Sequence, residues 1–216
     1  MPVRAAVQDG LDRLLGGLAQ VRIGAAGLED IIGHAAVARQ DEIILLEADP
    51  VVIEEFFFGQ EKVKVIACDG HTIGHISFWF PNSRALFVGD TIFSLGCGAL
   101  FEGSAREMWN SLERLRALPE DTLVYCAHEY TLENAAYAIT AEPEISRLKG
   151  RVEEAKRQIA SGCFTVPSSL ASEKACNPFL RPESSEIQRK VKMEGKPLWE
   201  VFAAIRKDKD LFDSNS

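Results

Sequence analysis

The 216-residue sequence has few histidines and no regular cysteine pattern. Its four histidines leave little imidazole for metal binding, so the position of each one matters. Its five cysteines are scattered and never spaced as Cys-x-x-Cys, which excludes a zinc-knuckle pattern and predicts no disulfide framework. Reduced thiols are the simplest interpretation of this spacing, and they favour a reducing compartment such as the cytoplasm.

Long apolar runs and an excess of basic residues are also lacking. No apolar run approaches the roughly 18 residues that a membrane span needs, so we expect no membrane partner. Asp9 and Asp12 interrupt any secretory pattern near the start, which again favours the cytoplasm. A net charge of −8 argues against a general nucleic-acid binder, which needs a basic surface. The remaining class is a globular protein with one large domain or a domain and an appendage.

The hydrophobic pattern changes twice along the chain. Residues 1–40 are rich in Ala, Gly and Leu and are weakly helical. The next section has the short apolar runs of strands, which we place at 43–46, 51–58, 63–66, 76–80 and 85–88. The last two of these strands should form a hairpin across the turn at residues 81–83. Residues 41–142 are therefore predicted to form a domain with a β-rich beginning.

From residue 104 onward the period becomes helical. Ser104 and Glu107 have the spacing of a capping box, and Met108, Leu112 and Leu115 then fall on one helix face. A strand at 122–126 and helices at 131–141 and 144–161 follow, then an irregular segment at 163–182 and a last helix at 198–207. The pattern indicates an α/β core with a helical C-terminal domain at residues 143–216.

Polar side chains follow three of the predicted strands directly. His71 comes after the strand at 63–66, Asp90 after 85–88, and His128 after 122–126. Any one of them could be a turn or capping residue, and the pair His71 and His75 could be structural. If the strand ends converge, however, imidazole nitrogen and carboxylate oxygen meet there, and these are ligands that suit zinc and iron. Three such junctions together favour a metal site.

Several longer strings resemble glyoxalase II, the hydroxyacylglutathione hydrolase family of the metallo-β-lactamase superfamily. They are GHTIGHISFWFP, ALFVGDTIFSLGCGALFEGS, LVYCAHEYTLENA, TVPSSLASEKACNPFLR and the terminal RKDKDLF. The resemblance implies an αββα sandwich with a helical C-terminal domain. It also implies hydrolysis of S-D-lactoylglutathione to D-lactate and glutathione, a step of methylglyoxal detoxification.

The resemblance further implies which residues form the site. His71 would bind the first of two metal ions, Asp90 would bridge both, and His128 would bind the second, the metal being zinc, iron or manganese. His75 would only hydrogen-bond locally. The glutathione thioester would be held by a second group of residues, namely Phe101, Tyr130, Arg206 and Lys209. Without the resemblance, Arg206 and Lys209 would be interpreted as a solvated helix end.

The sequence also departs from the family pattern. The string His-x-His-x-Asp-His, which supplies four metal ligands in the family, is absent, and His34 is the one histidine before His71. Residues 1–30 show no resemblance that we could identify, so we expect an incomplete sandwich that lacks the N-terminal part carrying this string. Ala99 replaces a basic substrate-contacting residue. We therefore expect weak metal binding and negligible hydrolysis, unless His34 or Glu129 replaces the lost ligands.

Three hypotheses remain open at this stage. The chain is a hydroxyacylglutathione hydrolase, or it is a catalytically inactive relative that at most binds glutathione conjugates. The third is a persulfide dioxygenase with a single iron, which the NPFLR and RKDKD strings disfavour. Self-association is also expected, because three consecutive phenylalanines, Phe56, Phe57 and Phe58, place apolar rings on both faces of one strand.

Overall fold

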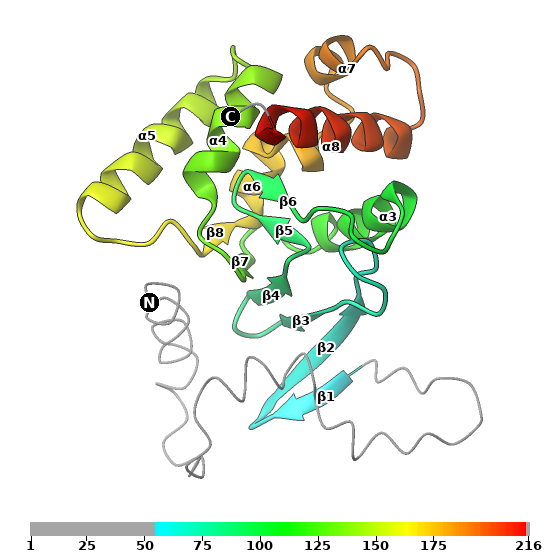
Figure 1. Ribbon diagram of the computed structural model, residues 1–216. Coiled ribbons are helices and arrows are strands. Elements are labelled where there is room, and N and C mark those ends of the chain that lie inside the picture. Colours follow the sequence, from blue (N-terminus) through cyan, green and yellow to red (C-terminus); the bar gives the residue numbers. More distant parts are fainter. Residues whose placement is uncertain (1–54, 215–216) are drawn as a thin grey trace.

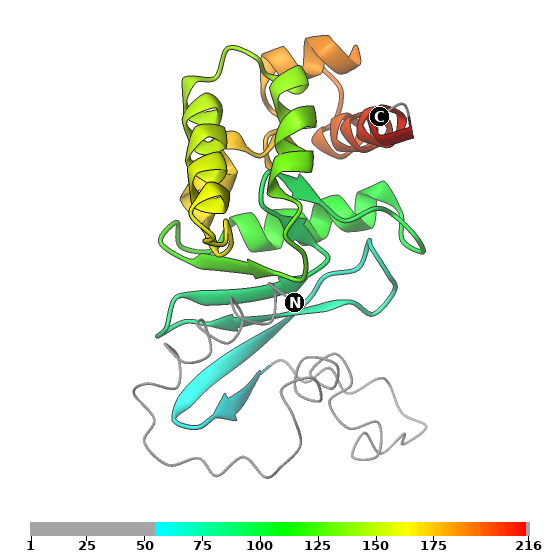
Figure 2. The same cartoon turned by 60° about the vertical axis from the view of Figure 1, so that its left-hand side comes forward.

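A mixed six-stranded sheet organises the protein in the computed structural model, which describes residues 55–214. The strand order is β1-β2-β3-β4-β7-β8, and a separate two-stranded sheet is formed by β5 and β6. Both views show the described helices on one side of the large sheet, and the small sheet lies between the large sheet and the C-terminal helices (Figures 1 and 2). The strands are β1 (Glu55–Phe58), β2 (Glu61–Ala67), β3 (Ile76–Phe80), β4 (Ala85–Gly89), β5 (Ile92–Phe93), β6 (Gly96–Cys97), β7 (Leu123–Cys126) and β8 (Ser168–Ser169).

Strands β1 to β4 form an antiparallel meander, and β7 then joins β4 in parallel. The predicted hairpin is confirmed, with Phe80 opposite Ala85. The strands predicted at 63–66, 85–88 and 122–126 are confirmed within a few residues. The strand predicted at 43–46, the first four residues of the one at 51–58 and the helix in 1–40 lie outside the described residues. Because β4 and β7 are parallel neighbours, their carboxyl ends, Gly89 and Cys126, lie side by side.

Helix α3 (Ala105–Arg116) begins where the sequence predicts and covers one face of the sheet. It begins at Ser104 with a capping box, in which the serine oxygen accepts from the backbone N–H of Glu107 and the glutamate accepts from the N–H of Ser104. The buried side chains of the helix include Met108, Leu112 and Leu115, and all three belong to the main core. Burial of this apolar stripe holds the helix against the sheet.

The opposite face of the sheet is lined by aromatic rings. Phe80 and Phe87 approach edge to face at 5.5 Å, and Phe87 stacks on Tyr125 at 4.8 Å. Phe56 and Phe58 belong to the same cluster, whereas Phe57 points to the other side and is 68% exposed. The expected alternation of the three phenylalanines is therefore confirmed, and self-association stays a prediction.

The remaining helices form the C-terminal part beside α3 (Figure 1). Their bounds are α4 (Thr131–Ala141), α5 (Ser146–Ala160), α6 (Leu170–Cys176), the short 3-10 helix η1 (Pro178–Leu180), α7 (Ser185–Val191) and α8 (Leu198–Ser214). No helix within residues 55–214 is long and apolar enough to cross a membrane.

Two of our sequence predictions for this part are wrong. The segment 163–182 is not irregular, because Ser169 caps α6 by accepting from the N–H of Ser172, and Asn177 caps the 3-10 helix that follows. The last helix does not end near residue 207. It continues to Ser214, and ion pairs four residues apart, such as Arg206 with Asp210, add stability to the extra turns.

A buried carboxyl group is expected to give the protein a characteristic pH dependence. Glu173 is fully buried, and one of its oxygens, Oε2, accepts from the N–H of Leu95 at 2.9 Å and from Asn177 Nδ2 at 3.1 Å. Its other oxygen has no hydrogen-bond partner among residues 55–214. Burial raises the pKa of this carboxyl above its ordinary value of 4.5. The folded state therefore binds a proton that the unfolded state releases, and stability falls as pH rises above that value.

We expect Glu173→Gln to remove this loss of stability, because the amide stays neutral and keeps an acceptor for Leu95 and Asn177. Urea denaturation at about pH 5 and about pH 8 should give a smaller decrease in the free energy of unfolding for the variant than for the native chain. Burial raises the pKa of Glu142 as well. Glu142 is present in both the native chain and the variant, so the difference between their pH dependences reports on Glu173 alone. Parallel pH curves would contradict this interpretation.

Candidate metal and substrate site

The carboxyl end of β4 bends sharply to present Asp90. Gly89 has φ of +52°, and a Cβ atom at this position would lie 2.8 Å from His75 Nε2. That nitrogen accepts from the N–H of Asp90 at 3.4 Å, and the other ring nitrogen lies 3.3 Å from the hydroxyl of Thr91. Burial lowers the pKa of His75, so the ring is neutral and can accept. The predicted local role of His75 is confirmed: its ring holds the backbone at Asp90.

The three residues predicted to bind metal lie together at this edge of the sheet. Nε2 of His71 is 3.7 Å from Oδ2 of Asp90, and Nε2 of His128 is 3.3 Å from Oδ1 of the same carboxylate. Asp90 is therefore placed between the two imidazoles, with one oxygen toward each. This arrangement follows from the strand order, because β4 and β7 are parallel neighbours and the loop after β2 reaches the same edge.

The orientation of His71 favours a cation at this edge. Its Nδ1 lies 2.8 Å from the carbonyl oxygen of Ala99, so Nδ1 carries the proton and donates. In the neutral ring Nε2 then has a lone pair that faces a carboxylate oxygen, and two acceptors face each other. The buried Oδ1 of Asp90 has no hydrogen-bond partner within residues 55–214. A positive ion between His71 Nε2 and Oδ2 would satisfy that pair of acceptors, and one between His128 Nε2 and Oδ1 would satisfy the unpaired oxygen.

The donor types fit a carboxylate-bridged pair of metal positions, but the number of donors is small. No group of three His, Cys, Asp or Glu side chains in the described part of the chain surrounds a single point. Each position has one imidazole nitrogen and one carboxylate oxygen, whereas zinc sites use three or four protein ligands. Glu129, considered as a replacement ligand, is hydrogen-bonded to Thr131 and Thr165 instead. His34 lies outside the described residues.

Two aromatic rings flank the imidazoles. The ring of Phe101 is 4.8 Å from that of His71 and is 73% exposed. The ring of Tyr130 stacks on that of His128 at 4.8 Å, with an angle of 16° between the planes, and Phe93 packs edge-on against Tyr130 at 5.4 Å. Phe101 and Tyr130 were both predicted to contact substrate. The structure places one beside each imidazole, and both rings are exposed.

Two basic residues of α8 complete the set of predicted site residues. Arg206 and Lys209 are both buried, so they do not form a solvated helix end. Arg206 donates to the carbonyl oxygen of Cys97 at 3.0 Å and pairs with Asp210 at 2.7 Å. Lys209 pairs with Asp213. Burial raises the pKa of the Cys97 thiol to about 11, so this neighbour of Arg206 stays protonated.

The segment 97–101 connects the basic pair to the imidazoles. Its first residue accepts from Arg206, its Ala99 carbonyl accepts from His71, and its last residue, Phe101, lies against the ring of His71. Gly98 allows this approach, because a Cβ atom there would lie 2.0 Å from the carbonyl oxygen of Asp90. The predicted metal residues and the predicted substrate residues are thus joined by one short stretch of backbone.

Sequence reasoning overlooked residues that hold the backbone next to the site residues in place. Arg151 of α5 is buried and donates to the carbonyl oxygen of Thr165, and the N–H of Thr165 donates to Glu129 beside His128. Asn177 bonds to the carbonyl oxygens of Phe93 and Gly96. Asn177 belongs to the family-like NPF string and Thr165 to TVPSS. These strings identified the family, but they did not show which backbone groups the side chains of Asn177 and Thr165 would contact.

Two protein-family models match consecutive parts of this chain. The model described as "Metallo-beta-lactamase superfamily" matches residues 4–128, and "Hydroxyacylglutathione hydrolase C-terminus" matches residues 129–212. The first match includes most of the N-terminal segment for which we expected no resemblance. The crystal structure of ETHE1 from Myxococcus xanthus overlaps with 72% of this chain and 56% of its own, at 26% identity and a TM-score of 0.41.

Two curated relatives are both named hydroxyacylglutathione hydrolase. The one from Methylococcus capsulatus is 50% identical over 190 residues, which cover 88% of this chain and 70% of the relative. The one from Rhizobium etli is 52% identical over 159 residues, which cover 74% of this chain and 62% of the relative. The chain thus spans about two thirds of the length of these relatives. With matches to both family models and this degree of identity, the chain belongs to the hydroxyacylglutathione hydrolase family of the metallo-β-lactamase superfamily.

Proposed function

We propose that the chain acts on hydroxyacylglutathione thioesters, hydrolysing S-D-lactoylglutathione to D-lactate and glutathione in methylglyoxal detoxification, at a rate well below that of an ordinary enzyme. The observation that carries the proposal is the Asp90 carboxylate between two imidazole nitrogens, at 3.7 Å and 3.3 Å. The same segment that holds His71 also contacts the basic residue Arg206. A charged peptide and a reacting thioester would therefore bind along one stretch of backbone.

Each residue then has a distinct part in the proposal. Arg206 and Lys209 bind the glutathione carboxylate through charge-assisted hydrogen bonds. Phe101 and Tyr130 hold the thioester between their rings and exclude water from its apolar side. His71, Asp90 and His128 would contact a divalent metal, zinc or else iron or manganese, which when bound supplies hydroxide near neutral pH. The Ala99 carbonyl keeps His71 in the required tautomer.

A second candidate function is binding of glutathione conjugates without hydrolysis. One observation favours it, because each metal position has only one imidazole nitrogen and one carboxylate oxygen from residues 55–214. On the substrate side, Ala99 stands where the family pattern has a basic residue, but Phe101, Tyr130, Arg206 and Lys209 are all present. The substrate side of the site is more complete than the metal side, so binding should survive where hydrolysis is weak.

The state of the cysteines supports a location in the cytoplasm. All five are free thiols, four of them buried, and none is paired in a disulfide. Burial raises the pKa of Cys126 to about 12, which keeps this thiol close to the site in its protonated, unreactive form. Free thiols are the rule in reducing compartments.

Metal content and thioester hydrolysis test the proposal together. We expect less than one firmly held metal ion per chain after dialysis, and a turnover at least tenfold below the roughly 10 per second of an ordinary enzyme. Added zinc, iron or manganese should raise the rate, and Asp90→Asn should abolish that response because it removes the shared carboxylate. S-methylglutathione binding, measured by calorimetry, serves as the second readout.

Each outcome distinguishes the candidates. Metal-dependent turnover that is lost in Asp90→Asn supports the hydrolase. Binding of S-methylglutathione without any metal-dependent turnover supports the binding function. Failure to bind S-methylglutathione contradicts both candidate functions. Two firmly held metal ions per chain contradict the conclusion that each metal position has too few protein ligands.

A separate prediction concerns Asp213, whose carboxylate pairs with Lys209 and lies 3.9 Å from Arg206. A substrate carboxylate bound by these two residues would compete with it. We expect Asp213→Asn to tighten S-methylglutathione binding about two- to fivefold, the range of a partly exposed ion pair. Calorimetry checks this. Glu153→Gln is the control, because it removes a carboxylate from an exposed ion pair with Lys156 on α5, a helix that carries none of the proposed substrate residues. Unchanged or weaker binding in Asp213→Asn would contradict the competition.

A further inference from the structure

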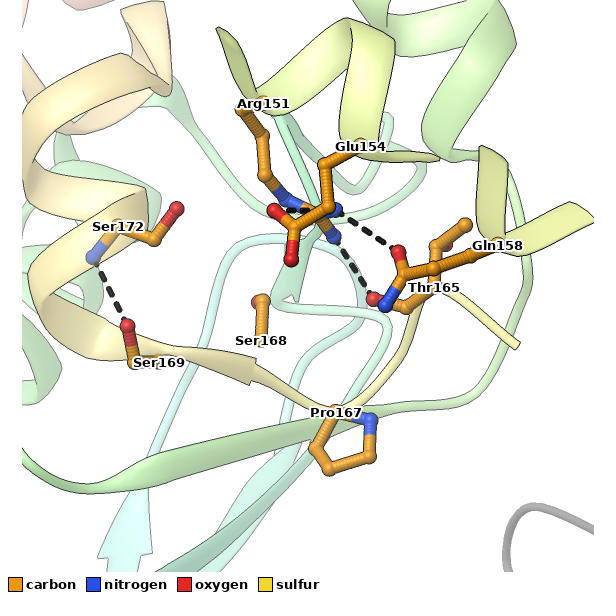
Figure 3. Close-up of a pocket in the computed structure, with 8 residues that line it drawn as sticks. All are labelled: Arg151, Glu154, Gln158, Thr165, Pro167, Ser168, Ser169 and Ser172. Carbon is orange, nitrogen blue, oxygen red and sulfur yellow. Dashed lines mark hydrogen bonds and ion pairs between the residues drawn. The ribbon is translucent and has the colours of Figure 1, made fainter. Parts of the chain in front are cut away.

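Helix α5 carries a buried arginine, Arg151, at the wall of a polar cavity of about 140 Å³ (Figure 3). Its exposed fraction is 8%. A guanidinium group in such a position is costly unless its charge and its N–H groups are satisfied. One terminal nitrogen, Nη1, faces the cavity, where it donates to Gln158 at 3.2 Å and lies 3.5 Å from Glu154.

The other terminal nitrogen joins two segments that are distant in sequence. Nη2 of Arg151 donates to the carbonyl oxygen of Thr165 at 2.7 Å and to the hydroxyl of Ser94 at 3.3 Å. Figure 3 shows the guanidinium group directed from α5 toward Thr165. Thr165 precedes β8, and Ser94 lies in the turn between β5 and β6. A residue of the C-terminal helices thereby holds two pieces of backbone together.

The first of these pieces fixes the residue after His128. The N–H of Thr165 donates to Oε2 of Glu129 at 3.2 Å, and the hydroxyl of Thr165 hydrogen-bonds to Oε1. Thr131 donates to Oε1 as well, at 3.3 Å. Both oxygens of Glu129 are therefore held by Thr165. Thr131, which also bonds to Oε1, is itself hydrogen-bonded to the Thr165 hydroxyl.

The second piece supports the ring of His128. Ser94 directly follows Phe93, whose ring lies 5.9 Å from His128 and 5.4 Å from Tyr130. The Ser94 carbonyl accepts from Asn134 Nδ2 at 3.1 Å, so this turn is held from α4 as well. Movement of the turn would move the Phe93 ring and, with it, the stacked pair of His128 and Tyr130.

We propose that Arg151 is a positioning residue that sets the orientation of the His128 imidazole and the Tyr130 ring, acting through Thr165 on one side and Ser94 on the other. The proposal deepens the proposed function, since it concerns the same site, but its test requires neither metal nor substrate. It assigns to the C-terminal helices a part in shaping the edge of the sheet that carries His128, in addition to the glutathione contact proposed for Arg206 and Lys209.

Imidazole NMR signals of the metal-free 216-residue chain test this directly. The four histidines give four sets of ring signals, which can be assigned by substituting each histidine in turn. We expect Arg151→Gln to shift the ring signals of His128 and to leave those of His71 and His75 unchanged. Arg151→Lys, which can reach one of the two acceptors, should give a smaller shift in the same direction. Glu154→Gln alters the cavity side of the same arginine and should leave all signals in place.

Two outcomes would overturn the proposal. The first is a folded Arg151→Gln protein with native His128 signals. The second is a set of equal shifts at His71, His75 and His128, which would indicate a general loosening of the fold. If Arg151→Gln does not fold, Thr165→Val decides the question, because it retains the carbonyl that Arg151 binds and removes the hydroxyl that binds Glu129. Unchanged His128 signals in that variant would overturn the proposal as well.

Discussion

Gly98→Ala is expected to lower the free energy of unfolding by about 3 kcal/mol and to abolish conjugate binding. The added Cβ atom would lie 2.0 Å from the carbonyl oxygen of Asp90 and 3.0 Å from Nδ1 of His71. The first of these neighbours is backbone, so it cannot move aside as a flexible side chain could. Overpacking of this kind costs about 1–3 kcal/mol, and the upper end applies where backbone must shift.

The loss of binding follows from the position of Gly98. The segment 97–101 carries the carbonyl groups that accept from Arg206 and His71, and displacing it breaks both contacts. Urea denaturation and calorimetry with S-methylglutathione measure the two effects. Gly150→Ala is the matched control, since Gly150 lies inside α5 and its Cβ atom would meet nothing within 4 Å. That change should stabilise the protein by up to about 1 kcal/mol. A stable, binding-competent Gly98→Ala protein would contradict the close approach.

Asn177→Ala is expected to destabilise the protein to a similar extent, by about 3 kcal/mol. Its Nδ2 atom donates to the carbonyl oxygens of Phe93 at 3.2 Å and Gly96 at 2.9 Å, and its Oδ1 atom accepts from the N–H of Phe179. Asn177 itself is fully buried. Removing its amide leaves buried carbonyl groups unpaired, each at a cost of about 1–3 kcal/mol.

The loss should also reach the site, because β5 and β6 are two-residue strands held from outside by Asn177. Chemical denaturation gives the stability, and Asn177→Asp separates shape from donor capacity. The aspartate keeps the acceptor for Phe179, loses the donor groups and places a second carboxyl beside Glu173, so it should be no more stable than the alanine variant. Asn110→Ala, on the exposed side of α3, should change stability by less than about 0.5 kcal/mol. Equal effects at the two asparagines would contradict the role of Asn177.

Local patterns were sufficient for elements whose stability is local. The capping box of Ser104 and Glu107 identified the start of α3, and the apolar stripe identified its buried face. The hairpin of β3 and β4 followed from two apolar runs and a short turn. In contrast, β5 and β6 have two residues each, so they contain no period to recognise. Their pairing depends on side chains from distant elements, above all Asn177 and Asn134.

The site shows the same division. Its three strand-end residues, His71, Asp90 and His128, were found from where polar side chains follow apolar runs, and the family resemblance separated His71 from His75. The arginine proposed to position His128 was not found, because Arg151 lies on a helix with the charge pattern of a solvent-exposed surface. Only its contacts with Ser94 and Thr165 distinguish it.

By itself, the amino-acid sequence determined the family, the α/β class, the cap of α3 and the residues that follow β2, β4 and β7. These depend on side-chain type and on spacing within one segment. Only the tertiary structure decided that Arg206 and Lys209 are buried, that each imidazole faces a different oxygen of Asp90, and that Arg151 reaches the segments around His128. Those facts depend on which distant segments pack together, because burial and the orientation of a side chain are set by neighbours that no local pattern specifies.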